Sequence, residues 1–92
     1  MSVSVLVPTP LRKFTDDRET VHATAGTVAS LVADLDRQFP GIAGRLTDES
    51  GDVRKFVNIY VNEEDIRFLS GKDTIVRDGD SVSIVPAIAG GL

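Results

Sequence analysis

The sequence predicts a single α+β domain in which one helix packs across a sheet. Three observations lead to this expectation. The chain has 92 residues, which is the length of one domain and is enough for a single core. Several short stretches alternate apolar and polar residues as strands do, whereas one stretch repeats with the period of a helix. Apolar residues make up 41% and charged residues 26% of the chain, which is typical of a globular protein and argues against disorder.

The N-terminal region predicts two strands that pair with each other. Val3, Val5 and Val7 recur at every second position, which indicates a half-buried strand that ends at the Pro-Thr-Pro after it. A polar turn at residues 15–18 follows, and residues 19–24 again have the composition of a strand. Because the connection is short, we expect the two strands to form an antiparallel hairpin.

The middle of the chain predicts the main helix. Thr27 is a favourable N-cap, and the Pro-Gly pair at 40–41 ends the helix near residue 39. We expect a further short helical turn at residues 42–46 and a polar loop at 47–52. The apolar residues of the main helix recur at the spacing of one helical face: Val28, Leu31, Val32, Leu35 and Phe39.

The C-terminal half predicts three further strands. A turn at residues 62–65 leads to a short strand around 66–68, and a tight Asp-Gly-Asp turn at 78–80 leads to a last strand at 81–86, with Val82 and Ile84 facing inward. The expected order is therefore β-β-α-β-β-β. At residues 56–61 the two faces of the expected strand differ: Val57, Ile59 and Val61 lie on one, and Phe56, Asn58 and Tyr60 on the other.

Charge and hydropathy argue against several classes of protein. The formal net charge is −4, and the ten basic residues are scattered along the chain, which argues against nucleic-acid binding. The acidity indicates either a surface that attracts a basic partner or ordinary solubility. No apolar run approaches the ~18 residues of a membrane span, and the N-terminus lacks the features of a secretory signal. We therefore expect a cytoplasmic protein that binds neither membranes nor nucleic acid.

Side chains suited to catalysis or metal binding are scarce. The absence of cysteine excludes a disulfide scaffold, a thiolate metal site and a cysteine nucleophile. His22 is the single histidine and has no acid or nucleophile beside it in sequence, so a structural or surface role is favoured. The acidic run at 62–65 lacks the ligand spacing of a calcium loop, and no phosphate-binding glycine motif is present. We expect a protein that is not itself an enzyme and binds no cofactor or metal.

The last six residues predict a different kind of reactive group. Residues 87–92 are small or apolar and contain the pair Gly90-Gly91, so we expect a flexible tail after a domain at 1–86. A carboxylate on glycine is unhindered, because no Cβ shields it. Such a tail can thread a narrow channel into another protein, where ATP would adenylate its carboxylate and a sulfur or nitrogen nucleophile would receive the acyl group.

With these features the sequence resembles the small ubiquitin-like sulfur carriers of the ThiS/MoaD family over essentially its whole length. The resemblance is most specific in Val61-Asn62, in the turn and strand at 78–86, and in Gly90-Gly91. It implies a β-grasp fold, with a mixed sheet of four to five strands whose first and last strands are parallel. It also implies that the Gly91 carboxylate is the reactive group, with Ala89 and Gly90 threading into the partner.

Within the family, residues 56–68 and the ending at 86–91 are most similar to the actinobacterial CysO-type carriers of cysteine biosynthesis. This resemblance implies an E1-like adenylating and sulfur-transferring enzyme that uses ATP and a sulfur donor to form a thiocarboxylate. It further implies a pyridoxal-phosphate synthase that accepts the sulfur and a JAMM-type metalloprotease that releases the product. Related carriers serve molybdopterin, thiamine and thio-sugar pathways. The free carrier is expected to be a monomer.

The sequence departs from the family at Leu92, which follows the glycine pair. Either a protease removes Leu92 to expose Gly91, or Leu92 is an addition to the natural chain. Two other functions stay open from the residues alone. The chain is alternatively a ubiquitin-like modifier that forms isopeptide bonds, or a β-grasp interaction module with an incidental tail.

The sequence also predicts a surface for binding a partner. The helix needs only one face of the sheet, so apolar residues on the opposite face have no evident internal partner. The last strand on that face leads directly to the tail, so a partner bound there would be well placed to receive Gly91. The expected partner-binding face consists of Leu6, Phe56, Tyr60 and Val85.

Overall fold

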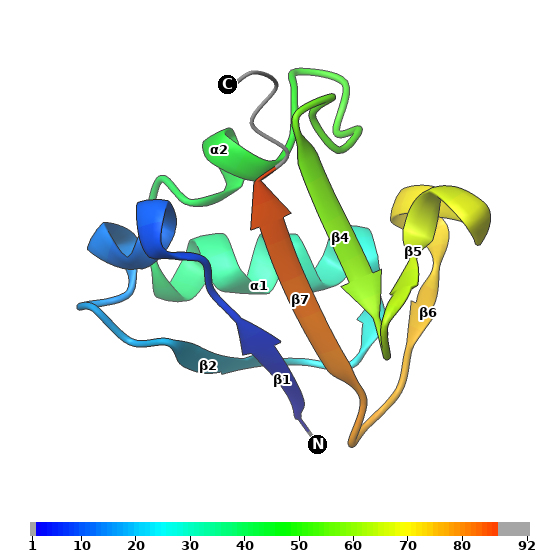
Figure 1. The fold of residues 1–92 in the computed structure, drawn as a ribbon, viewed down its shortest axis with the longest axis horizontal. Helices are drawn as coiled ribbons and strands as arrows, with labels where there is room; N and C mark the ends of the chain where they lie inside the picture. Colours follow the sequence, from blue (N-terminus) through cyan, green and yellow to red (C-terminus); the bar gives the residue numbers. More distant parts are fainter. Residues whose placement is uncertain (1, 87–92) are drawn as a thin grey trace.

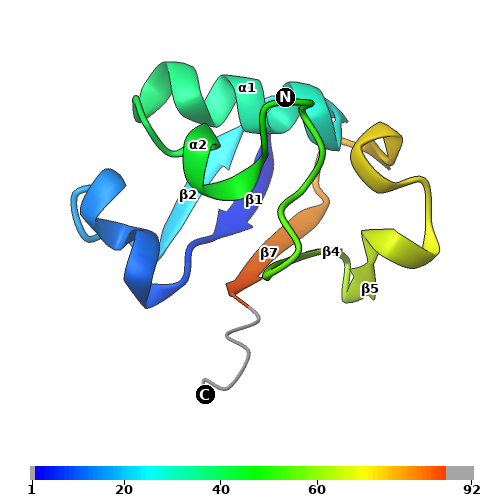
Figure 2. The ribbon, with the colours of Figure 1, turned by 90° about the horizontal axis from the view of Figure 1, so that it is seen from above.

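The computed structural model describes residues 2–86 of the chain. Within them, the main sheet has five strands in the order β2-β1-β7-β4-β5, and α1 (Val28–Gln38) lies across one face (Figure 1). Figure 2 shows the short helix α2 (Ala43–Leu46) on the same side of the sheet as α1. The strands of the main sheet are β1 (Val3–Leu6), β2 (Thr20–Ala23), β4 (Val57–Val61), β5 (Glu64–Asp65) and β7 (Ser81–Pro86).

Strand pairing gives the sheet its mixed topology. β1 and β2 form the expected antiparallel hairpin, in which Val5 lies opposite Val21. β1 runs parallel to β7, with Val5 opposite Val82, and β7 runs antiparallel to β4. The predicted β-grasp arrangement, in which the first and last strands are parallel neighbours, is therefore confirmed.

The core lies between the helix-facing side of the sheet and α1. Each strand contributes alternate residues, because successive side chains of a strand point to opposite faces. Apart from Phe39, which is partly buried, the residues that the pattern assigned to the core are buried, and full burial of such a side chain contributes about 1.5–3 kcal/mol. They are Val3, Val5, Val7, Val57, Ile59, Val61, Val82 and Ile84 from the sheet and Val28, Leu31, Val32 and Leu35 from α1.

The boundaries of α1 follow from its cap and its terminator. The Ser30 N–H donates to Thr27 Oγ1 at 3.1 Å, and the Thr27 N–H donates to Ser30 Oγ at 2.9 Å. This reciprocal pair satisfies two backbone donors that the first turn leaves without helical partners. Phe39 is the C-cap, and Pro40 follows it, so the predicted end of the helix is confirmed.

One expected strand is wrong. Residues 66–68 form a 3-10 helix (Ile66–Phe68), and the strand that pairs with β4 is β5, directly after the turn. The turn residues Asn62 and Glu63 have φ of +50° and +73°, respectively, values in the left-handed region that a tight two-residue hairpin requires. The Asp65 carboxylate then accepts from the Arg67 N–H at 2.9 Å and starts the 3-10 helix, which ends the pairing after two residues.

Several short elements were not expected from the sequence. A second, two-stranded sheet joins β3 (Gly26–Thr27) to β6 (Ile75–Val76), and 3-10 helices occur at Thr9–Phe14 and Gly71–Asp73. A strand of two residues is too short to show the alternation of apolar and polar residues, which is why the sequence pattern did not predict β3 and β6. β4 also begins at Val57, so Phe56 lies just before the strand and not within it.

Candidate functional site

The end of β7 is the part of the described structure that leads to the candidate reactive group. β7 is bonded to β1 on one side and β4 on the other, and it ends at Pro86 (Figure 1). Ala89, Gly90 and Gly91, and the expected tail at 87–92 as a whole, lie outside the described residues. The strand that precedes the tail is therefore held on both sides by the sheet.

Three residues of the expected partner-binding face come together on the side of the sheet away from α1. Leu6 lies opposite Ser83 of β7, and Ser83 lies opposite Tyr60 of β4, so Leu6, Ser83 and Tyr60 form one row across the central strands. Val85 stands two residues further along β7 on the same face. Leu6 and Val85 are 43% and 42% exposed, and Tyr60 is half-buried. Binding of a partner to this face stays a prediction.

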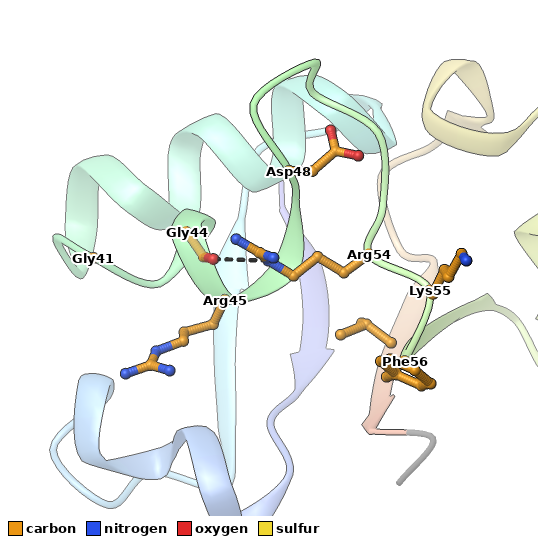
Figure 3. A pocket seen from close by; sticks show the side chains of 8 residues that line it. Gly41, Gly44, Arg45, Asp48, Arg54, Lys55 and Phe56 are labelled. Carbon is orange, nitrogen blue, oxygen red and sulfur yellow. Dashed lines mark hydrogen bonds between the residues drawn. The ribbon is translucent and has the colours of Figure 1, made fainter. Parts of the chain in front are cut away.

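Phe56, the fourth residue of that set, lies apart from the row. It precedes β4, is 60% exposed, and lines a groove next to α2 (Figure 3). Its neighbour Val57 pairs with Pro86, which places the groove at the end of the sheet where β7 ends. The structure thus separates the expected face into a row on the sheet and an aromatic residue at its edge.

Asn58 belongs to the same face and was not singled out from the sequence. It lies opposite Val85 and is half-buried. Its Oδ1 is buried and has no hydrogen-bond partner among the residues that the structure describes. A buried acceptor without a donor is unfavourable, and a donor from a bound partner would satisfy it. Strand alternation predicted the face of Asn58, but only the cross-strand register reveals its neighbours.

The start of β7 is fixed by residues that the family resemblance singled out. Asn62 Nδ2 donates to Asp80 Oδ1 at 3.0 Å, and the Ser81 N–H donates to Asn62 Oδ1 at 3.0 Å. Gly79 has a φ of +89°, which few residues other than glycine adopt. The Asp78 carboxylate accepts from the Ser2 N–H at 2.7 Å. These motif residues join β1, β4 and β7 at one end of the sheet.

Two carboxylates have lowered pKa values, and both are part of such hydrogen-bonded structures. The Arg77 N–H, at 2.8 Å, and then the Asn62 amide lower the pKa of Asp80 below its ordinary value. The Arg37 side chain is the main cause of the lowered pKa of Asp34 on α1. Hydrogen bonds to the charged form favour it, so each lowered pKa reports a stabilised carboxylate and not an acid–base catalyst.

The remaining side chains offer little chemistry. His22 is exposed on β2. Between residues 2 and 86, no group of three or more His, Asp or Glu side chains is placed to hold a metal ion. None of the helices in this part of the chain is long and apolar enough to cross a bilayer.

Comparison with known proteins identifies the family. The ThiS family matches residues 5–91. The sulfur carrier protein CysO of Mycobacterium tuberculosis is 47% identical over 93 residues, covering 99% of this chain and 100% of the relative. A chain in the crystal structure of the Amycolatopsis orientalis BexX/CysO complex matches with a TM-score of 0.91 and 42% identity, covering 97% of this chain and 99% of that one.

A third relative has a name of a different kind. Small archaeal modifier protein 3 of Haloferax volcanii is 40% identical over 65 residues, covering 71% of this chain and 70% of the relative. The expected resemblance to the ThiS/MoaD carriers is thus confirmed by a match over nearly the full length, by curated relatives and by structure. The chain belongs to the ThiS family and is a ubiquitin-like, CysO-like relative of the sulfur carrier proteins.

Proposed function

We propose that this chain carries sulfur as a thiocarboxylate on Gly91. An E1-like enzyme joins the Gly91 carboxylate to the AMP portion of ATP, and pyrophosphate leaves. The sulfur of a donor then attacks the acyl carbon, a carbon–sulfur bond forms, and AMP leaves. The observation that carries this proposal is the full-length likeness to a sulfur carrier that includes the glycine pair.

The described residues are consistent with a protein that is acted upon. A carrier supplies a reactive terminus and a surface for recognition, whereas its partner supplies ATP binding and acid–base groups. The fold provides the first requirement by holding β7 on both sides up to Pro86, five residues before Gly91. Its exposed apolar residues next to that point support the second.

The acceptor that we propose for the sulfur is an aminoacrylate on a pyridoxal-phosphate synthase, as in CysO-type cysteine biosynthesis. The thiocarboxylate sulfur adds to the β-carbon of the aminoacrylate and forms a carrier–cysteine adduct. A JAMM-type metalloprotease then hydrolyses the adduct and releases cysteine. Molybdopterin, thiamine and thio-sugar synthases are the alternative acceptors, and each is tested by supplying it with the thiocarboxylate form.

The experiment uses a chain that ends at Gly91. In the 92-residue sequence the carbonyl of Gly91 forms the peptide bond to Leu92, so Gly91 has no free carboxylate to activate. This chain is incubated with the E1-like enzyme of the same organism, ATP and sulfide, and its intact mass is measured. We expect the mass increase that corresponds to replacement of one carboxylate oxygen by sulfur. The matched control is the 92-residue chain, whose mass should not change. An unchanged mass of the Gly91 chain, with an enzyme that is active on another carrier, would contradict the proposal.

A second candidate function is attachment to other proteins. The Haloferax relative is named as a modifier, and such a function would use the same activated Gly91 with a lysine amine as the nucleophile. Incubating the activated chain with a protein extract distinguishes the two. Covalent adducts that resist thiol reagents and contain a Gly91–lysine isopeptide bond favour the modifier, whereas a thiocarboxylate without such adducts favours the sulfur carrier.

A further inference from the structure

A groove of about 750 Å³ lies between α2 and the segment that precedes β4. Gly41 and Gly44 line one side, and Lys55, Phe56 and Val57 line the other (Figure 3). Since Val57 is paired with Pro86, the groove adjoins the end of β7. Gly91 is five residues beyond Pro86 and so at most about 17 Å away from it in an extended chain. An enzyme that acts on Gly91 therefore works within reach of this groove.

The rim of the groove is basic, in contrast to the chain as a whole. Arg45, Arg54 and Lys55 are exposed and line it, although the net charge of the protein is −4. The ion pairs of residues 2–86 are Arg37–Asp34 and Lys72–Asp52, so none of the three cations belongs to one. The Arg54 Nε donates to the Gly44 carbonyl at 3.0 Å, which holds this side chain across the groove (Figure 3).

Among residues 2–86, Asp48 is the one acidic residue that lines the groove, and its carboxylate already accepts hydrogen bonds. Its Oδ1 accepts from the Ser50 N–H at 2.9 Å and from the Asp52 N–H at 3.1 Å, so it shapes the loop. The lining holds three cations against this one carboxylate, so its net charge stays positive. Glu49 and Asp52 belong to the same loop as Asp48, and Asp36 accepts from the Gly41 and Ala43 N–H groups, but none of these three residues lines the groove.

Phe56 adds an apolar surface to this basic rim. Its side chain is 60% exposed at the edge of the groove, and Figure 3 shows it on the opposite side from Arg45. A cationic rim beside an exposed aromatic ring matches a peptide segment in which a carboxylate neighbours an apolar side chain. Charge complementarity at such a site guides association as well as adding affinity.

We propose that this groove binds an acidic segment of the enzyme that activates Gly91. In this arrangement one or two carboxylates of the enzyme contact Arg45, Arg54 and Lys55, and an apolar side chain of the same segment packs on Phe56. The inference rests on the proposed function, because it takes the activating enzyme as the occupant. It assigns to that enzyme an acidic docking surface beside the channel that receives the tail.

The test compares two single charge reversals in the chain that ends at Gly91. Lys55→Glu changes the groove, whereas Arg77→Glu makes the same change of net charge near the start of β7. Affinity for the activating enzyme is measured by calorimetric titration at low and at high salt. We expect Lys55→Glu to weaken binding by about tenfold or more at low salt. It should also make the affinity less dependent on salt, because salt screens the attraction between an exposed charge and its partner, and this variant removes that attraction. Arg77→Glu should leave the affinity nearly unchanged.

Arg45→Glu is a second variant of the groove, from α2 instead of the loop, and should weaken binding in the same way. Unaltered affinity in both Lys55→Glu and Arg45→Glu, with normal thermal unfolding, would overturn the inference. A second result would also overturn it. If Lys55→Glu changes self-association of the free chain but not its binding to the enzyme, the groove binds a second copy of the chain. Conversion of the unsubstituted chain to the thiocarboxylate distinguishes the two proposals. If the unsubstituted chain is converted and the groove variants bind the enzyme with normal affinity, only the groove proposal is refuted. If the unsubstituted chain neither binds the enzyme nor is converted, both proposals are refuted.

Discussion

At the scale of single residues, the motif that relates this chain to its family acts on structure and not on chemistry. Asn62 and Asp80 are separated by 18 positions but hydrogen-bond through their side chains, and together they fix the start of the strand that leads to the tail. The sequence predicted the turn around Gly79 from its residue types. It could not predict the role of Asn62, because that role depends on a cross-strand contact.

The hydrogen bonds of Asp80 predict a specific dependence of stability on pH. Because its pKa is lowered in the folded state, Asp80 stabilises the fold above its ordinary pKa, and this contribution is lost as the pH falls through the folded value. Asp80→Asn should therefore reduce the fall in the free energy of unfolding between about pH 5 and pH 2. Urea unfolding across this range measures it.

The control for this prediction is Asp16→Asn. The Asp16 side chain makes no hydrogen bond within residues 2–86, and asparagine tolerates its φ of +54°. This variant should follow the wild-type pH profile. If Asp80→Asn also keeps the full acid-induced loss of stability, the hydrogen bonds to Asp80 do not contribute as described.

A second prediction at the residue scale concerns Gly91. Gly91→Ala should leave the fold intact, since Gly91 lies beyond the last strand, and should lower adenylation by the activating enzyme. The added methyl group crowds the carboxylate in a narrow channel, and a displacement of about 1 Å at a reacting centre costs on the order of 10²-fold in rate. ATP–pyrophosphate exchange measures the effect. An exchange rate equal to that of the unsubstituted chain would rule out this use of the glycine.

At the scale of elements, the length of an element decided whether the sequence revealed it. α1 combines a capping residue, a helical apolar period and a Pro-Gly terminator, and these three signals agree. β3, β5 and β6 have two residues each, so they depend on pairing partners that are distant in sequence. The strand expected at 66–68 is wrong for a local reason: the Asp65 cap starts a 3-10 helix there, and this outweighs the weak strand pattern.

The N-cap of α1 provides a prediction at this scale. Thr27→Ala removes the side-chain acceptor for the Ser30 N–H and should lower the free energy of unfolding by about 1 kcal/mol. Urea unfolding with an unchanged m-value would measure it. Thr24→Ala is the matched control, because only the backbone N–H of Thr24 takes part in a hydrogen bond in the structure. Equal losses of stability in both variants would show that the cap is unimportant.

At the scale of the whole molecule, the end of the sheet where β7 ends carries both exposed apolar residues and the basic groove. The sequence predicted from strand alternation that Leu6, Tyr60 and Val85 share one face, and the register confirms it. It could not predict the basic groove, since the groove is formed by α2 and by a loop that follows it. Arg54 and Lys55 are adjacent in the sequence, but Arg45 joins them only through the fold.

The last prediction tests whether the sheet face that carries Leu6, Tyr60 and Val85 is the surface that the activating enzyme contacts. Val85→Asp places a charge in its exposed part, so it should weaken binding to that enzyme with little loss of stability, because Val85 is 42% exposed. Leu31→Ala, in the core, should instead cost about 2–5 kcal/mol of stability. Ala29→Asp places the same charge on the exposed side of α1, away from this face, as a control. Calorimetric titration and thermal unfolding of the three variants measure both properties, and wild-type affinity for Val85→Asp would show that the enzyme docks elsewhere.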